Sequence, residues 1–421
     1  IIIDQTGEMI AKYYKPERGD IIFNPFDARS TAWDFWSDCS SPEELERFAK
    51  ILFSFNRKRT GHSSDPFWEQ SAESIFIACA NYQKSIGDLR IEQLYMLAGT
   101  GSLKSLRAKL KMSEAARYLE PDNKTTASSI LSVLATNVKP LSYLRSSDPS
   151  NNFSLKEYFK SIDQGKDSCL FLATKPSYRD LTIALIACMT EIAFAELLDI
   201  GIKEDRRVWF VIDELSALGK LPSLPTLTAE GRKYGACLLC GLQSLNQLYA
   251  NYGQYEGSTI FGQFGTNFFF RNSEPAIAAT ISSMAGTETL IRQQKNTSYG
   301  AHEFRDGVSY SEHQQQKKLI EYSDLASLAV GECFVLLPEP EVRVVKLKIP
   351  EAKLANKNEE FMQSGSPITE LQGQDLVQDI EDDNNDLRKL ESIEQDSSRS
   401  LDDYEQNNKH DLDAEHSVIK S

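Results

Sequence analysis

The stretch Arg206-Arg207-Val208-Trp209-Phe210-Val211-Ile212-Asp213-Glu214 decides how the rest of the chain is interpreted. Its branched and aromatic residues form an unbroken apolar run between charges, which predicts a buried strand of a parallel sheet. Open α/β sheets bind ligands where such strands end, and this strand ends in two adjacent carboxylates. One can hold the water shell of a magnesium ion, and the other can polarise a water molecule. The alternative is a core strand whose acids merely meet solvent.

Strands and helices alternate on both sides of this stretch. We expect further strands at Ile1–Ile3, Asp20–Phe26, Asp167–Ala173, Ala236–Leu242 and Thr266–Arg271, and helices at Asp180–Leu198, Leu224–Tyr234, Leu245–Tyr252 and Glu274–Met284. This rhythm predicts an α/β fold, a mostly parallel sheet with helices on both faces. Beyond Thr287 the pattern allows hairpin strands, and the last strands are expected at Glu332–Leu337 and Val342–Ile349.

An all-helical insertion interrupts the alternation from about Thr31 to Ile162. Apolar residues recur there at helical spacing in five segments, Glu43–Phe55, Asp65–Gln83, Arg90–Ala98, Leu103–Met112 and Thr125–Leu144. Two basic groups lie in this insertion, Arg57-Lys58-Arg59 and Lys104/Arg107/Lys109/Lys111. Either can contact DNA phosphates, although at helical spacing the second group is more often a solvated helix face.

The charge of the chain is unevenly distributed. Of the formal net charge of -15, most belongs to residues 351–421, which hold 19 acidic and 7 basic side chains and few aromatic ones. Such a segment buries too little apolar surface to offset its chain entropy, so we expect a disordered acidic tail. The remaining body is near neutral, and its composition therefore does not exclude DNA binding. The seven scattered cysteines suggest buried thiols in a reducing compartment.

Further polar residues follow the strand after Asp213-Glu214. The carboxyl ends of neighbouring parallel strands meet at one edge of a sheet, so Gln243, which ends the next strand, is expected beside the acidic pair. A glutamine there can sense a phosphate or orient a water. Arg232 precedes that strand and is poorly placed to reach the same site, which makes it a candidate for serving a neighbouring subunit. The alternative for Arg232 is a surface salt bridge.

These motifs, in this order, resemble the conjugative type IV coupling proteins, TraD-like members of the P-loop DNA-translocase group. The resemblance covers roughly residues 1–350. It includes Ile2-Ile3-Asp4 with Gly7-Glu8, similar to the family's Asp-x-x-Gly-Glu turn, as well as Phe23-Asn24-Pro25-Phe26-Asp27 and Asp65-Pro66-Phe67-Trp68. It implies a RecA-like sheet that binds ATP and Mg²⁺. Asp213 would then hold the magnesium through water, Glu214 would activate the attacking water, and Arg232 would be a finger offered to the adjacent subunit. Asp4 and Gln243 would lie at the nucleotide, with Gln243 as its γ-phosphate sensor.

The resemblance also implies domains and partners. Residues 1–30 would begin the nucleotide-binding domain, 31–162 would form the all-alpha domain, 163–350 would complete the RecA-like domain, and 351–421 would be the acidic tail. The family is a hexameric, DNA-dependent ATPase at the cytoplasmic face of the bacterial inner membrane. It links a relaxase-bound single strand to the channel proteins of type IV secretion, and the tail would meet relaxosome proteins.

One departure from the family pattern is large. The phosphate-binding loop G-x-x-x-x-G-K-[ST] is absent from the 421 residues, and the nearest imitation, Gly99–Ser105, has no Gly before Lys104 and follows a helical segment. Because the chain begins inside a strand and without Met, we expect a fragment that alone neither binds ATP tightly nor hydrolyses it. The alternatives are a non-enzymatic adaptor or decayed paralogue that docks DNA-processing proteins through its tail, and a double-stranded DNA motor of the same group. The second alternative is disfavoured because no DNA-reading winged helix is evident.

Overall fold

A computed structural model describes residues 1–59, 66–120, 124–145, 152–203, 205–299, 306–339, 343–352 and 354–364. Its centre is a five-stranded sheet with strand order β2-β5-β1-β6-β7. The strands are β1 (Ile2–Asp4), β2 (Ile21–Phe23), β5 (Leu170–Ala173), β6 (Val208–Ile212) and β7 (Ala236–Cys240). All pair in parallel, which confirms the parallel α/β fold and the strand assignment of the opening stretch.

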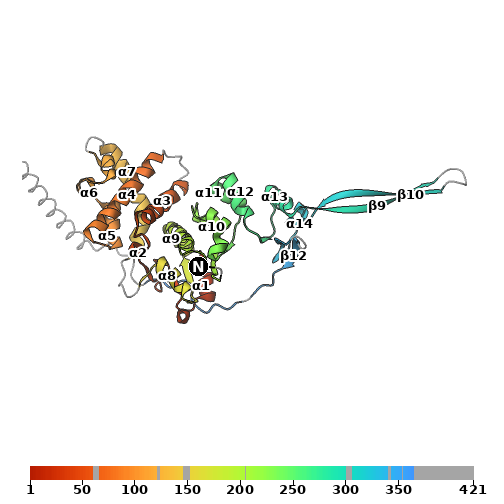
Figure 1. The fold of residues 1–421 in the computed structure, drawn as a ribbon, viewed down its shortest axis with the longest axis horizontal. Coiled ribbons are helices and arrows are strands. Elements are labelled where there is room, and N and C mark those ends of the chain that lie inside the picture. Colours follow the sequence, from red (N-terminus) through yellow and green to blue (C-terminus); the bar gives the residue numbers. More distant parts are fainter. Residues whose placement is uncertain are drawn as a thin grey trace, which may run out of the picture.

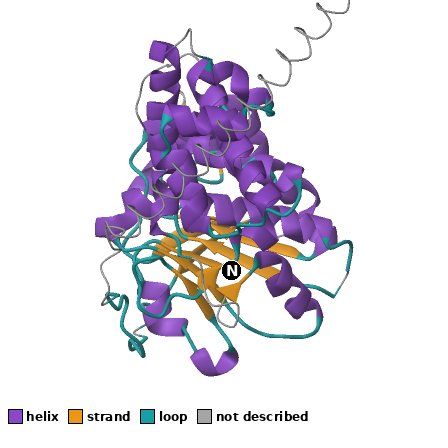
Figure 2. Cartoon of the chain, turned by 90° about the vertical axis from the view of Figure 1, so that its left-hand side faces the viewer, coloured by secondary structure: helices purple, strands orange, loops and turns teal. Residues whose placement is uncertain are grey.

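One face of this sheet is covered by helices. The 21-residue helix α9 (Arg179–Asp199) is buried along almost its whole length against this face, together with side chains such as Ile3, Leu172 and Phe210. Figure 2 shows this helical layer above the sheet. Within the described residues, only the segment Pro176–Asp199 has the length and hydropathy of a membrane span, and 89% of its 18-residue apolar window is buried inside the protein.

The opposite face is covered only in part. Helix α1 (Glu8–Tyr13) packs there over β2, β5 and β1 through a small cluster that includes Ile10, Ile22 and Phe171. Over β6 and β7 this face is open, with Trp209 57% and Leu239 52% exposed. The outer edge of β7 has no strand partner among the residues that the structure describes. On this second face, the expected helical cover is therefore present over β1, β2 and β5 and absent over β6 and β7 among the described residues.

The all-helical insertion, drawn in orange at the left of Figure 1, packs against α9 through its helix Pro42–Arg59. Its helices are α2 (Phe35–Asp38), α3 (Pro42–Arg59), α4 (Pro66–Ile86), α5 (Ile91–Tyr95), α6 (Leu103–Leu110) and α7 (Lys124–Val138), with a π-helical turn at Met96–Thr100 and 3-10 turns at Glu114–Leu119 and Lys139–Tyr143. The five predicted helices are thus present. The last one changes to a 3-10 turn at Lys139 because Pro140 cannot continue an α-helix. At the base, β3 (Ala32–Trp33) pairs in parallel with β4 (Asn152–Phe153), and α8 (Leu155–Asp163) leads back to the sheet.

After β7 the chain leaves the central sheet. Helices α10 (Leu224–Glu230), α11 (Leu245–Tyr252) and α12 (Gln254–Gly262) pack beside it, but the strand predicted at Thr266–Arg271 does not join it. This strand, β8 (Asn267–Phe269), lies in a separate antiparallel sheet with β11 (Glu332–Leu336) and β12 (Val344–Lys348). Phe269 and Leu336 there share a second core with α13 (Pro275–Ala285) and α14 (Tyr322–Ala326). A long hairpin, β9 (Thr287–Tyr299) with β10 (Asp306–Lys318), projects from this part (Figure 1).

The segment after β12 returns to the central domain. Residues 354–364, which we call the strap, run along α1 and the turn after β2. The backbone amides of Lys357 and Asn358 donate to Ala11 O (2.8 and 3.0 Å), and Ala28 N donates to Met362 O (2.8 Å). The predicted tail boundary at Glu351 is therefore too early, because these backbone groups find partners that composition does not reveal. Residues 365–421 lie outside the described part of the chain.

Candidate functional site

The two acidic residues after β6 and the polar turn after β7 lie side by side. Ile212 is paired in register with Cys240, so Asp213-Glu214 and Gly241-Leu242-Gln243 leave the sheet together at its carboxyl edge. Asp213 and Gln243 are exposed, and Glu214 is half-buried. Parallel pairing thus brings these three predicted site residues to one edge, as expected from the sequence.

Gly241 lets the two strand ends approach each other closely. Its amide donates to Ile212 O (2.8 Å), and its carbonyl accepts from Leu215 N (3.0 Å). A Cβ at this position would lie 2.0 Å from Asp213 O, a distance that no side chain tolerates. Gly241 therefore belongs to the site as the residue that lets β7 cross the backbone of the acidic pair. In the sequence, Gly241 falls inside the strand expected at Ala236–Leu242, and the pattern alone does not indicate this role.

The backbone around Glu214 is held from two other elements. Gln5, in the loop after β1, donates from Nε2 to Glu214 O (3.3 Å), and Asn251 on α11 donates from Nδ2 to Ser216 O (2.8 Å). In contrast to this backbone, the Glu214 side chain is not held: its Oε1 is buried and has no hydrogen-bond partner among the described residues. A buried acceptor without a partner is costly, so it is typically matched by a ligand or a water.

Asp4 has a structural role that the sequence analysis did not foresee. Its side chain is buried, and its Oδ1 accepts from Gly7 N (2.8 Å) while its Oδ2 accepts from Met9 N (2.9 Å) and Ile10 N (3.0 Å). These bonds cap the amino end of α1, which otherwise has unpaired amides. The predicted contact of Asp4 with a cofactor is therefore not supported by the geometry, because both oxygens face the protein's own backbone.

Arg232 lies at the other edge of the sheet from the acidic pair. It is part of the 3-10 turn Gly231–Tyr234 that precedes β7, whereas Gln243 follows β7. Its side chain is exposed and forms no salt bridge with a described residue, in contrast to its neighbour Lys233, which pairs with Glu230. The structure therefore does not bring Arg232 to Asp213 and Glu214 of its own chain, and it does not show the surface salt bridge considered as an alternative.

The Gly-rich segment Gly99–Ser105 is part of the helical insertion. It joins the π-helical turn to α6, where the Ser102 hydroxyl accepts from Ser105 N (3.1 Å) as an ordinary helix cap. Because it follows a helix and lies far along the chain from any central strand, its dismissal as a phosphate loop agrees with the structure.

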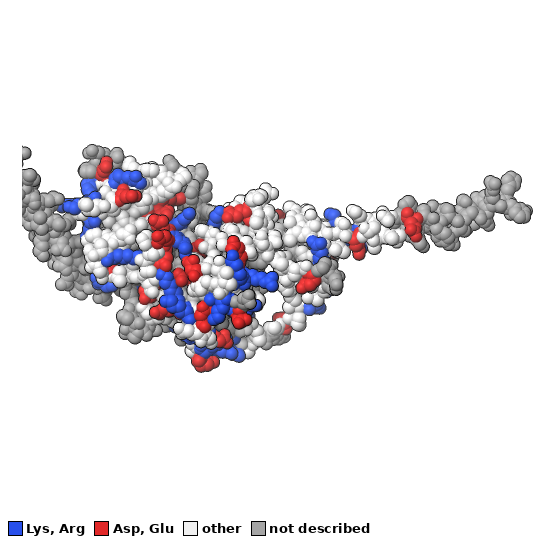
Figure 3. Space-filling view, in the orientation of Figure 1, with Lys and Arg blue, Asp and Glu red and all other residues white. Residues whose placement is uncertain are grey.

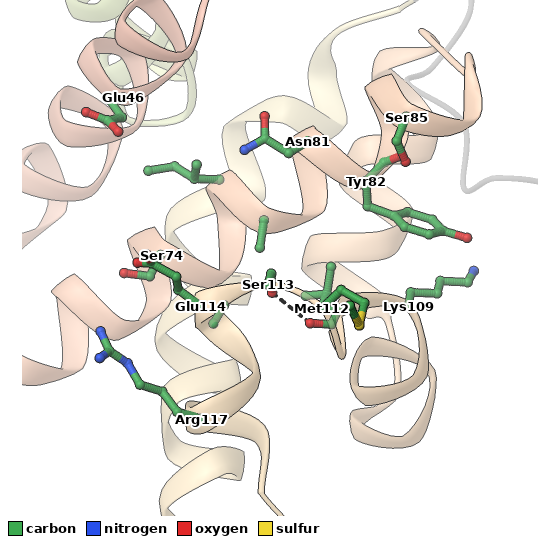
Figure 4. Close-up of a pocket in the computed structure, with 14 residues that line it drawn as sticks. Glu46, Ser74, Asn81, Tyr82, Ser85, Lys109, Met112, Ser113, Glu114 and Arg117 are labelled. Atoms are coloured by element: carbon green, nitrogen blue, oxygen red, sulfur yellow. Dashed lines mark hydrogen bonds between the residues drawn. The ribbon is translucent and has the colours of Figure 1, made fainter.

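A groove of about 660 Å³ opens elsewhere in the helical insertion (Figure 4), between α3, α4, α6 and the turn Glu114–Leu119. Its charged lining residues are Glu46, Glu114, Lys109 and Arg117. The Lys109 ammonium lies 5.9 Å from the centre of the Tyr82 ring. Acidic and basic side chains are likewise intermixed on the face of the molecule seen in Figure 3. The suggestion that the α6 cations contact DNA stays a prediction.

A parallel α/β core, an acidic pair and a glutamine at one sheet edge, and an inserted helical domain define an α/β protein whose polar strand ends are arranged as in phosphate-handling folds. The chain belongs to a particular family of this class, since the family model "Type IV secretion-system coupling protein DNA-binding domain" matches residues 1–350. The suspected resemblance to coupling proteins is thus confirmed.

Curated relatives agree with this assignment. The chain is 32% identical over 342 residues to the coupling protein TraD of Escherichia coli K12, an alignment that covers 81% of this chain and 47% of TraD. It is 34% identical over 95 residues to the conjugal transfer protein TraG of Agrobacterium fabrum, covering 22% of this chain and 14% of TraG. The chain therefore spans less than half the length of these relatives.

Solved structures share the fold. The unbound conjugative coupling protein TrwBdeltaN70 superposes with a TM-score of 0.72 at 21% identity, over 86% of this chain and 80% of the other. TrwB in complex with a non-hydrolysable ATP analogue gives a TM-score of 0.71 at 20% identity, and TrwB with ADP and Mg²⁺ gives 0.70 at 21%, with the same 86% of this chain covered.

Proposed function

We propose that this chain is the nucleotide-hydrolysing and DNA-handling part of a conjugative coupling protein, an ATP-driven motor. The observation that carries the proposal is the edge at which Asp213, Glu214 and Gln243 emerge together from β6 and β7. Membership of the coupling-protein family and the nucleotide complexes of TrwB support ATP with Mg²⁺ as the ligand.

The residues at this edge fit such a ligand. Asp213 is an exposed carboxylate at a strand end, suited to hold the water shell of a magnesium ion. Glu214 presents a buried oxygen with no described partner, suited to accept a proton from a water molecule. Gln243 is exposed beside them and suited to sense the terminal phosphate. Bound Mg²⁺–ATP supplies the phosphoryl group and the charge that make this edge reactive.

The phosphate-gripping half of such a site has no counterpart in the 421 residues. We propose that a strand–loop–helix unit with the pattern G-x-x-x-x-G-K-[ST] completes it along the free edge of β7. This edge is the only one next to Gln243, and a helix after the new strand would cover the exposed apolar side chains of Trp209 and Leu239. The chain without this unit would lack the backbone amides that cradle phosphates, and we expect it neither to bind ATP tightly nor to hydrolyse it.

The proposal extends to the whole assembly. Arg232 lies away from the acidic pair of its own chain, which suits a finger that reaches the nucleotide of an adjacent subunit in a ring, in this family a hexamer. The substrate would be a relaxase-bound single DNA strand, passed to type IV secretion channel proteins at the cytoplasmic face of the bacterial inner membrane. Relaxosome proteins would bind the acidic tail.

Substitution of the acidic pair tests the enzymatic proposal in a version of the protein that supplies the phosphate-binding loop. Glu214→Gln should leave ATP binding intact and lower DNA-stimulated hydrolysis by about a hundredfold or more, because it removes the proton acceptor. Glu230→Gln, at the opposite edge of the sheet, is the matched control and should hydrolyse ATP normally. Unchanged turnover in Glu214→Gln, or robust turnover by the 421-residue chain alone, would contradict the proposal.

A non-enzymatic adaptor is the second candidate. It would dock DNA-processing proteins through the acidic tail without using a nucleotide. The two candidates differ in one measurement: an adaptor would retain partner binding and show no ATP hydrolysis even when the phosphate-binding loop is supplied.

A further inference from the structure

Gln5 is a buried polar residue to which the proposed function gives no role. It follows β1 directly and is 5% exposed. Its side-chain amide donates to Glu214 O, the same carbonyl oxygen that accepts from Ala217 N at 3.3 Å. Glu214 O thus accepts both from the turn Leu215–Leu218 and from a side chain in the loop after β1. This contact connects Glu214, whose Oε1 has no described hydrogen-bond partner, to the loop after β1.

The loop that carries Gln5 is itself unusually well fixed. Besides capping α1, the Asp4 carboxylate accepts from Thr6 N (3.2 Å) immediately after Gln5. The Asp4 carbonyl accepts from Thr174 N (3.0 Å) at the end of β5. Gln5 therefore stands between two residues whose backbone groups are anchored, and its side chain has little freedom to leave Glu214.

The strap closes this loop from outside. Its Glu360 carbonyl oxygen lies 2.5 Å from the position that a Cβ on Gly7 would take, so the main chain of the strap packs directly against the loop. Asn358 Nδ2 donates to Tyr14 O (3.0 Å) at the end of α1. Phe361 lies 6.2 Å from the Tyr178 ring and receives the Lys175 ammonium at 4.7 Å. The strap thus joins the loops after β1 and β5 at the edge where Glu214 emerges.

We propose that Gln5 is a positioning residue for Glu214. The strap keeps Gln5 in place because it packs against the loop Asp4–Gly7. The inference rests on the proposed function, in which Glu214 accepts a proton from water. To that function it adds the hydrogen bond from Gln5, which follows β1 directly, and the packing of the strap, which is distant in the sequence, against the loop that carries Gln5. Gln5 acts through the Glu214 backbone and does not touch the nucleotide.

Amide hydrogen exchange of the 421-residue chain tests the contact directly. Gln5→Met keeps the length and volume of the side chain and removes the donor. We expect exchange of the Ala217 amide to rise about fivefold, the factor for one lost hydrogen bond. The Val208 amide, which donates to Gly235 O (2.8 Å) at the far end of β6, should exchange as in wild type. Gln5→Glu, which also lacks the donor, is the second variant in case Gln5→Met does not fold.

Two results would overturn the proposal. One is unchanged exchange at Ala217, and the other is an equal rise at Ala217 and Val208, which would indicate general loosening of the fold. Supplying the phosphate-binding loop adds a kinetic readout: Gln5→Met should lower kcat several-fold and leave the KM for ATP unchanged. Exchange at Ala217 does not depend on hydrolysis, so an inactive Glu214 site would disprove the proposed function while leaving the positioning contact standing.

The strap is tested by a pair of substitutions far from Glu214. Asn358→Ala with Phe361→Ala should raise exchange of the Gly7 amide and, to a smaller extent, of the Ala217 amide. The matched control is Leu354→Ala, since Leu354 is 50% exposed at the start of the strap. A rise at Gly7 without any rise at Ala217 would show that the strap does not act on Glu214 and would remove it from the proposal.

Discussion

Gly241 and Asp4 have structural roles that their neighbours in the sequence do not indicate. Gly241 is required because the Asp213 carbonyl passes 2.0 Å from the position of its missing Cβ. Asp4 looks like a ligand residue at a strand end, yet both of its oxygens are used by backbone amides of the next helix. One glycine is thus part of the site, and one carboxylate is part of the scaffold.

Gly241→Ala should destabilise the fold, because the added methyl group cannot avoid the Asp213 backbone. We expect a loss of about 1–3 kcal/mol in the free energy of unfolding, measured by urea denaturation. Gly262→Ala is the matched control: Gly262 is in α12 with nothing within 4 Å of the added atom, and the change should be neutral or slightly stabilising. Equal stability of Gly241→Ala and wild type would contradict the close approach.

Asp4→Asn should lower stability even though it is nearly isosteric. The new NH2 group would either face the Met9 and Ile10 amides, which are also donors, or turn away and leave these amides without an acceptor. We therefore expect the free energy of unfolding to fall by about 1–3 kcal/mol. Glu8→Gln should stay within about 0.5 kcal/mol, because it removes only an exposed i,i+4 pair with Lys12. If Asp4→Asn melts like wild type, the capping role is wrong and the original ligand hypothesis returns.

At the scale of elements, acidic side chains that include Asp38 and Glu196 lie where the helical insertion meets the sheet domain. Asp38 at the end of α2 accepts from Leu155 N (2.8 Å) and Lys156 N (3.1 Å) and so caps α8, and burial raises its pKa to about 6. Glu196 on α9 is 7% exposed, and burial raises its pKa to about 7, with Asp38, Glu44 and Asp199 acting in the same direction and Lys156 opposing. Asp38 and Glu196 therefore hold their protons more tightly than free carboxyl groups do.

The sign of the pH effect follows from the raised pKa of Glu196. The folded state holds the proton more tightly than the unfolded chain, so the contribution of Glu196 to stability decreases as the pH rises from about 4.5 to about 7. Glu196→Gln mimics the neutral form. It should be more stable than wild type at pH 8, by on the order of 1–2 kcal/mol after allowance for solvent screening, and equal to it at pH 4. Urea denaturation at the two pH values measures the difference, and a constant difference would refute the assignment.

At the scale of the whole molecule, the C-terminal region has two parts, the strap and the acidic residues that follow it. Residues 354–364 bind the sheet domain through backbone bonds, whereas the acidic residues beyond them would bind a relaxosome protein under the proposed function. Deletions that end on either side of the strap should therefore have different consequences.

Deleting residues 370–421 should abolish pulldown of the relaxosome partner and leave the melting temperature unchanged, since the strap remains. Deleting residues 351–421 should abolish the same interaction and also lower the melting temperature, because α1 loses the groups that satisfy its last carbonyls. Calorimetry and pulldown measure the two effects. Retained binding after the shorter deletion would exclude the tail as the docking segment.

Much of this architecture was predictable from the sequence because it rests on local patterns. The apolar run Val208–Ile212, the helical spacing of Leu103–Met112 and the Pro at the start of α4 each act over a few residues, and each matches the structure. Placing β8 failed for the same reason: its apolar pattern specifies a strand but not which sheet it joins. The strap was missed because many of its bonds use backbone groups, which every residue has, and because its side-chain partners are distant in the sequence.

The sequence by itself determined that a buried strand ends in Asp213-Glu214, that Gln243 ends the next strand, and that both belong to a parallel α/β fold with a helical insertion. Only the tertiary structure decided which polar residues serve the scaffold and which remain available. It assigned the Asp4 carboxylate to backbone amides and left an oxygen of Glu214 without a described partner. It also placed Gln5, Gly241 and the strap around that residue. The physical reason is that side-chain patterns act locally, whereas hydrogen-bond satisfaction and close backbone approach depend on segments that can lie at opposite ends of the described chain.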